Sequence, residues 1–110
     1  MIIKLMRVTL IVRYPDEAFK FYTEKLDFNK RADQPMGENA RWLTISPKDD
    51  HNIEIVLQPL DWFESEERRE HAALVGKNPT MAFHIDDCRK TYDLLRGRGV
   101  IFEQSPRERP

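Results

Sequence analysis

The chain reads Phe21-Tyr22-Thr23-Glu24-Lys25-Leu26-Asp27-Phe28 within its first third. Apolar residues recur here at helical spacing and predict the buried stripe of a helix, made of Ala18, Phe21, Tyr22 and Leu26. Pro15 and the two acidic residues after it predict the helix start, because proline suits the first helical position and carboxylates favour the positive end of the dipole. Asp27 tolerates the left-handed conformation that ends a helix, so extended structure is expected over 28–32.

Strands are expected on both sides of this helix. Residues 6–12 are rich in β-branched and aliphatic side chains, and residues 41–46 and 52–58 have similar patterns around a turn over 47–51. Residues 34–39, which include proline, glycine and asparagine, predict a loop. The first half, 1–58, is therefore predicted to form one βαβββ module.

The second half begins the same order again. Residues 59–79 are dense in charge and predict an exposed helical linker. A strand is then expected over 80–85, a helix capped by Asp86 and Asp87 and ending near Gly97 and Gly99, and a further strand over 100–103. In both halves about 15 residues separate the first strand from the next, which indicates two copies of one unit.

Composition excludes several classes of protein. The 110 residues, 40% of them hydrophobic, fit a single domain with one core. Eighteen basic and nineteen acidic side chains leave a net charge of −1, which argues against nucleic acid or an anionic membrane as partner. The apolar runs are too short to span a bilayer, and the single cysteine, Cys88, cannot form an internal disulfide. We therefore expect a cytoplasmic protein.

The motifs together resemble the vicinal oxygen chelate superfamily, which includes glyoxalases, bleomycin resistance proteins and extradiol dioxygenases. The resemblance rests on residues 8–12, on the Phe-Tyr-x-x-x-Leu-x-Phe pattern of 21–28, on 41–45 and 53–57, and on a second match over 81–87 that continues through Tyr92, Leu95 and Gly99. It implies an α+β fold of paired βαβββ modules, with a curved half-barrel mixed sheet, helices outside and a ligand cleft. It covers one domain, 1–110, with a linker over 59–79.

Two departures from the family pattern stand out. The sequence lacks the family's final hairpin, so the second module, 80–110, is expected to be shortened to βαβ. Either the chain is a fragment or natural truncation, or a partner supplies the missing edge, and we expect a homodimer. Metal-using relatives carry a histidine where this chain has Arg7, and the repeated position is Thr80. A guanidinium has no acceptor and cannot bind a metal, which leaves Glu54 as the one surviving candidate ligand. No cofactor is predicted, with a divalent metal as the alternative.

The expected cleft contains both polar and aromatic residues. If Arg7 and Glu54 occupy the former metal positions, the guanidinium replaces the cation that a buried carboxylate needs. That pair either orients a polar ligand or is purely structural. The predicted ligand-binding residues are Arg7, Thr9, Trp42, Thr44, Glu54, Val56, Thr80, Ala82 and His84. No catalytic residue is assigned, although Glu54 and His84 are candidates for a ligand or general base.

Three functions are consistent with these residues. The leading interpretation is a protein that binds a small amphipathic molecule in the cleft without a catalytic metal. The alternatives are a metal-dependent lyase or dioxygenase, and a dimerisation scaffold with a vestigial cleft that would be favoured if Arg7 and Glu54 close on each other. The sequence leaves the ligand, the use of a metal and the enzymatic activity open.

Overall fold

The structure is a computed structural model that describes residues 1–37, 40–77, 79 and 81–106. The chain divides into two compact units, Met1–Thr80 and Met81–Pro110, which are described separately. Among the described residues, no helix has both the length and the apolar character needed to cross a bilayer.

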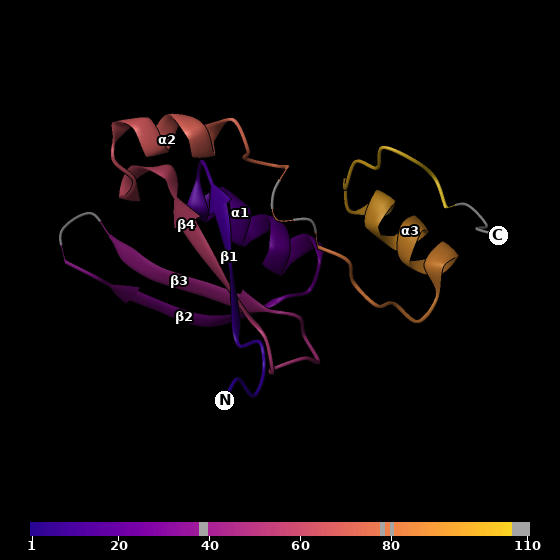
Figure 1. Cartoon of the computed structure of the whole chain (residues 1–110). Coiled ribbons are helices and arrows are strands. Elements are labelled where there is room, and N and C mark those ends of the chain that lie inside the picture. The colour runs from indigo at the N-terminus through magenta and orange to yellow at the C-terminus, as the bar shows by residue number, and fades with distance from the viewer. Residues whose placement is uncertain (38–39, 78, 80, 107–110) are drawn as a thin grey trace. The chain divides into compact units, whose positions relative to one another are not determined.

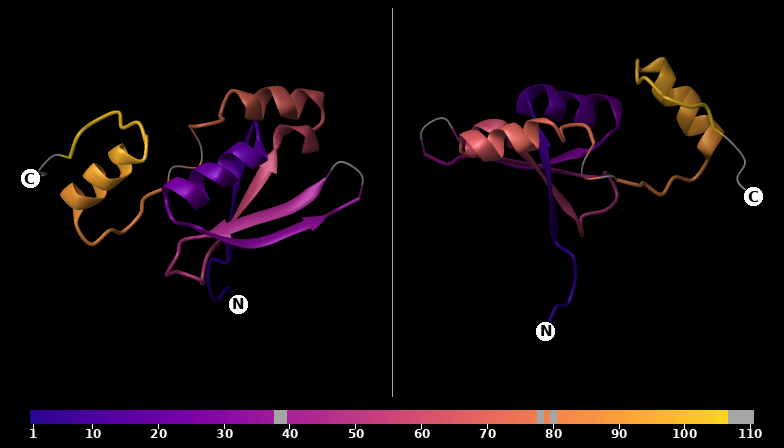
Figure 2. Two further views of the ribbon diagram at one scale, coloured as in Figure 1. Left: turned by 180° about the vertical axis from the view of Figure 1, so that it is seen from behind. Right: turned by 45° about the horizontal axis from the view of Figure 1, so that its top comes forward.

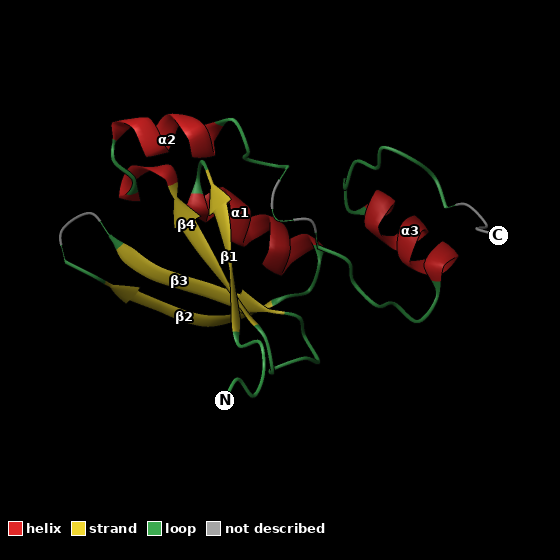
Figure 3. Ribbon diagram, in the orientation of Figure 1, coloured by secondary structure: helices red, strands yellow, loops and turns green. Residues whose placement is uncertain are grey.

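The first unit has the predicted βαβββ order (Figures 1 and 3). Its elements are β1 (Arg7–Val12), α1 (Pro15–Lys20), the π-helical turn η1 (Phe21–Lys25), β2 (Asn29–Pro35), β3 (Arg41–Ser46), β4 (Glu54–Pro59), the 3-10 turn η2 (Leu60–Trp62) and α2 (Ser65–Ala72). Both η2 and α2 lie in the predicted linker, where α2 buries none of its residues. The combination of helices and strands in this unit confirms the predicted α+β class.

The strands form an open, curved, mixed sheet in the order β1-β4-β3-β2 (Figure 1). The outer strand β1 runs parallel to β4, whereas β2, β3 and β4 pair in antiparallel fashion. Helix α1 lies across one face of this sheet, as seen from behind in Figure 2. The opposite face of the sheet carries the residues of functional interest.

The core of this unit lies between the sheet and α1. Because side chains alternate along a strand, one set from β1, β3 and β4 points towards the helix. Six of these side chains are at most 9% exposed: Leu10, Val12, Leu43, Ile45, Ile55 and Leu57. Burial of this continuous apolar layer is the main force that holds the sheet against the helix.

The helical segment formed by α1 and η1 ends where the sequence predicts. Asp27 has φ of 60°, and the Phe28 amide donates to the Tyr22 carbonyl at 2.9 Å, so the chain turns back as expected. Tyr22 packs against the Phe28 ring with centroids 5.2 Å apart, and burial raises its pKa. The prediction that Phe21 is buried is wrong, because it lies at the border of the apolar stripe and remains 37% exposed.

The second unit contains α3 (Cys88–Gly97), whose N-cap is Asp87. The Asp87 carboxylate accepts the Lys90 amide at 3.0 Å, and Gly99 adopts the left-handed φ of 90° that follows the helix. The predicted strands over 81–85 and 100–103 are not strands in the described residues. Their apolar pattern favours extended structure, but a strand also requires backbone pairing with a neighbour. Thr80, the first residue of one prediction, lies outside the described residues.

Candidate functional site

Strand register brings the predicted residues of the first unit to one face of the sheet. Arg7 is paired with Glu54 across the parallel β1 and β4, and Thr44 is paired with Val56 across the antiparallel β3 and β4. Residues paired in this way share a face, as do residues two positions apart on one strand. This face, opposite α1, therefore carries Arg7, Thr9, Trp42, Thr44, Glu54 and Val56, and we call it the open face. Thr44 and Val56 are buried, so the accessible residues on it are Arg7, Thr9 and parts of Trp42 and Glu54.

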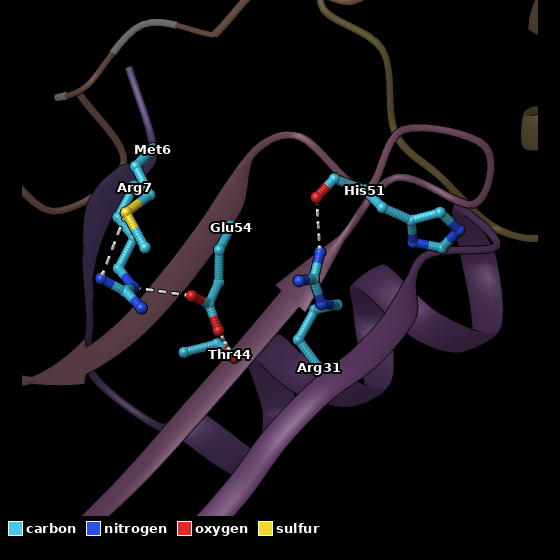
Figure 4. A network of polar contacts seen from close by, with 6 residues as sticks. All are labelled: Met6, Arg7, Arg31, Thr44, His51 and Glu54. Carbon is cyan, nitrogen blue, oxygen red and sulfur yellow. Dashed lines mark hydrogen bonds and ion pairs between the residues drawn. The ribbon is translucent and has the colours of Figure 1, made fainter. Parts of the chain in front are cut away.

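Glu54 lies at the centre of the polar contacts on the open face (Figure 4). Arg7 Nε donates to Glu54 Oε1 at 2.6 Å, and the Thr44 hydroxyl donates to Glu54 Oε2 at 2.5 Å. The Glu54 side chain is 14% exposed and Arg7 is 45% exposed, while Thr44 is fully buried. The carboxylate is thus held at both oxygens, and the expected proximity of Arg7 and Glu54 is confirmed.

An aromatic ring flanks this pair. The Arg7 guanidinium carbon lies 5.8 Å from the centroid of the Trp42 ring, within the range of a cation–π contact. Trp42 is half-buried, so part of this residue is accessible to solvent. The open face therefore combines a cation with an apolar wall.

The surroundings of Glu54 lower its pKa. Burial alone would raise the pKa of Glu54, but hydrogen bonds from Thr44 and Arg7 and the positive charges of Arg7 and Arg31 outweigh that effect. Glu54 therefore stays ionised at neutral pH. A carboxylate in this state is unsuited to act as a general acid, and its two oxygens are already engaged.

Arg31 was missed by the sequence prediction. It lies at the register shift between Lys30 and Ala32, where β2 carries an extra residue opposite β3. Its Nη1 donates to the His51 carbonyl at 3.0 Å (Figure 4), and its charge reaches Glu54. Simple alternation would place this side chain on the helix side, so only knowledge of the bulge could have identified it.

Ser46 was also missed, although its spacing could have revealed it. It follows Thr44 by two positions on β3 and therefore belongs to the open face. The residue is fully buried, and its hydroxyl has no hydrogen-bond partner among the described residues. Nothing in the described contacts explains this unpaired group.

The predicted residues of the second half lie in the second unit or outside the described residues. Thr80 lies outside the described residues. Ala82 and His84 belong to the second unit, where both are exposed and neither lies in a strand. The alternation that grouped His84 with Glu54 therefore has no structural basis here, and a role for either residue in binding stays a prediction.

A groove of about 440 Å³ lies elsewhere in the first unit. It is lined by residues such as Pro15, Leu57 and Trp62, and Leu57 points to the side of the sheet that α1 covers. Arg41 in its wall already pairs with Asp16 at 2.8 Å and with Asp33 at 3.1 Å. The indole Nε1 of Trp62 in this groove is buried and has no hydrogen-bond partner among the described residues. We place the candidate site on the open face because the predicted ligand-binding residues of the first unit gather there.

Comparison with known proteins agrees with this architecture. The family model described as Glyoxalase/Bleomycin resistance protein/Dioxygenase superfamily matches residues 4–110. The chain belongs to this superfamily.

Relatives of this superfamily member match most of its length. The Bacillus subtilis (strain 168) protein YurT, described as uncharacterized, is 36% identical to this chain. The match covers 94% of this chain and 80% of the length of YurT. The crystal structure of UcmS2 has 38% sequence identity to this chain and a TM-score of 0.88. The match covers 100% of this chain and 85% of the UcmS2 chain. TnmS3, described as an antibiotic binding protein from Streptomyces sp. CB03234, has 28% sequence identity to this chain and a TM-score of 0.71. The match covers 91% of this chain and 74% of the TnmS3 chain.

The residues around Glu54 do not fit the divalent metal that many superfamily members hold. Arg7 places a permanent positive charge 2.6 Å from Glu54 Oε1, and a second cation would be repelled there. Among the described residues, no group of three or more histidine, cysteine, aspartate or glutamate side chains could hold a metal ion. No chemical step through a metal is therefore derived for this site.

The lowered pKa of Glu54 predicts how stability responds to acid. Ionised Glu54 stabilises the fold above its unfolded pKa of about 4.3, and this contribution is lost as pH falls through the lower folded pKa. Since Arg7 is partly screened by solvent, we expect Glu54→Gln to cost about 1–2 kcal/mol near pH 7 and much less in acid. Urea unfolding of both proteins across this range measures the difference.

The exposed Glu70 of α2 provides a matched control. Glu70→Gln should leave the free energy of unfolding nearly unchanged at either pH, because surface substitutions have small effects. A cost of Glu54→Gln that stays constant with pH would show that the ionised carboxylate does not stabilise the fold.

Proposed function

We propose that this protein binds a small amphipathic molecule on the open face and holds it without chemical change. The observation that carries this proposal is the state of Glu54, whose two oxygens accept hydrogen bonds from Arg7 and Thr44. The carboxylate that could act as base or metal ligand is thus engaged within the protein. The description of TnmS3 as an antibiotic binding protein in the same fold supports a binding role.

The residues beside Glu54 suit such a ligand. Trp42 offers an aromatic surface for an apolar body, and Arg7, which is 45% exposed, offers hydrogen-bond donors for a polar group. Neither residue needs a metal for these contacts. The proposal therefore includes binding without a divalent metal.

A scaffold with a vestigial cleft is the second candidate, and one observation favours it. Arg7 and Glu54 do pair with each other, as expected for a structural ion pair that fills a former metal position. The two candidates differ in whether the open face binds anything. A direct binding measurement separates them.

Phenylnaphthylamine, an uncharged aromatic dye, is a suitable first probe. We expect saturable binding of one dye per chain, quenching of Trp42 fluorescence, and recovery of the dye with unchanged mass. The Trp62→Phe variant should keep the quenching, because Trp42 then remains as the reporter, whereas Trp42→Phe should lose it. Absence of saturable binding would favour the scaffold and contradict the proposed function.

We also propose that the protein forms a homodimer. The described sheet pairs β1 on one side only, and an edge strand of this kind favours pairing with another chain. The segment before β1 exposes apolar side chains, including Ile3 at 90% and Leu5 at 68%, which a second copy would cover.

Analytical ultracentrifugation tests the homodimer. We expect the unaltered protein to sediment as a dimer and Ile3→Lys/Leu5→Lys to shift it towards monomer. Met36→Lys, at a residue 46% exposed in the loop after β2, should leave the dimer intact. A monomer at all concentrations would contradict the proposed homodimer.

A further inference from the structure

The acceptor atoms around Glu54 are already occupied. Glu54 Oε1 accepts from Arg7 Nε and Oε2 accepts from the Thr44 hydroxyl. Thr44 has one hydroxyl hydrogen, which this bond uses, and the residue is fully buried. A ligand that approaches the open face therefore meets a carboxylate that is already satisfied.

Donor atoms, in contrast, remain available. A guanidinium has five N–H donors, and Arg7 uses Nε on Glu54 and directs Nη1 towards Met6 Sδ at 3.8 Å, a weak acceptor. Arg31 uses Nη1 on the His51 carbonyl, and its side chain is exposed. Figure 4 shows Glu54 between these two arginines.

The charges of the open face do not balance. Arg7 and Arg31 each carry a positive charge, and Glu54 is the one acidic side chain that β1, β2, β3 and β4 place on this face. Asp33, the other acidic residue of these strands, pairs with Arg41 on the helix side. The open face therefore has an excess of one positive charge beside the Trp42 ring.

We propose that the open face selects a ligand with an anionic group, such as a carboxylate, sulfonate or phenolate, attached to an aromatic body. The anionic group would accept hydrogen bonds from Arg7 and Arg31, and the aromatic body would pack on Trp42. This inference rests on the proposed function and adds the charge of the ligand to it.

Two dyes with the same ring system test this preference. Anilinonaphthalene sulfonate carries an anionic group, whereas phenylnaphthylamine lacks it. We expect the sulfonate to bind at least about tenfold more tightly, because charge-assisted hydrogen bonds contribute on that scale. The preference should decrease as salt is added, since Arg7 and Arg31 are both exposed to solvent.

Substitutions at the two arginines locate the preference. Arg31→Gln should weaken binding of the sulfonate several-fold and leave the uncharged dye unaffected. The matched control Lys30→Gln removes a neighbouring exposed cation whose partner, Ile45, points to the helix side, and it should change neither affinity. Because Arg7 alone cannot be removed without leaving Glu54 unpaired, Arg7→Met/Glu54→Gln replaces both charges together. Arg31 remains in this variant, so the preference should decrease several-fold through loss of the Arg7 donors.

The outcomes separate the inference from the function on which it rests. Equal affinity for the two dyes, or a sulfonate preference unaffected by Arg31→Gln and by the double variant, would overturn the anionic ligand but keep a binding function. Two results would overturn the binding function itself. One is that neither dye binds. The other is that the dye binds without quenching tryptophan fluorescence in the unaltered protein and binds equally well to Trp42→Phe. A decreased preference in both arginine variants, with Lys30→Gln unaffected, supports the inference.

Discussion

Glu54 is a carboxylate on a mostly covered part of a β-sheet, and a charge in that position must be paired. The free energy of removing a carboxylate from water is unfavourable by several kcal/mol unless a cation and hydrogen-bond donors compensate for it. Arg7 provides the cation and one donor, and Thr44 provides the other donor. The parallel register of β1 and β4 places Arg7 directly beside Glu54, so this pair also joins the outer strand to the centre of the sheet.

The same interaction determines what chemistry the site can support. Members of the glyoxalase, bleomycin resistance and dioxygenase superfamily share a fold, but a fold does not determine function. In this chain the positive charge beside the carboxylate belongs to a side chain rather than to an ion. We propose that this arrangement serves recognition of a ligand by charge and stacking rather than activation of a ligand by a Lewis acid.

Local sequence signals predicted the first unit well because its elements are specified by nearby residues. Proline starts α1, Asp27 ends the helical segment after η1, and the strands over 41–46 and 54–59 alternate in side-chain type. Each of these signals acts within a few positions of the chain. The closeness of Arg7 and Glu54 could be predicted only through the resemblance to a family, because 46 residues separate them along the chain.

Features that depend on pairing or irregularity could not be predicted in this way. Arg31 reaches the open face because β2 contains an extra residue, which no pattern in the sequence marks. Residues 81–85 and 100–103 have the composition of strands, but composition cannot provide the backbone partner that a strand requires. The grouping of His84 with Glu54 relied on alternation along such a strand, and it stays a prediction.

Native mass spectrometry with metal analysis tests the central claim, that Arg7 replaces a metal ion beside Glu54. The protein should be purified without chelator or affinity tag and then exposed to zinc, nickel, iron and manganese in turn. The account predicts no stoichiometric metal on the unaltered protein and none on Glu54→Ala. One metal ion per chain that is lost in Glu54→Ala would contradict the account and support a metal-dependent enzyme.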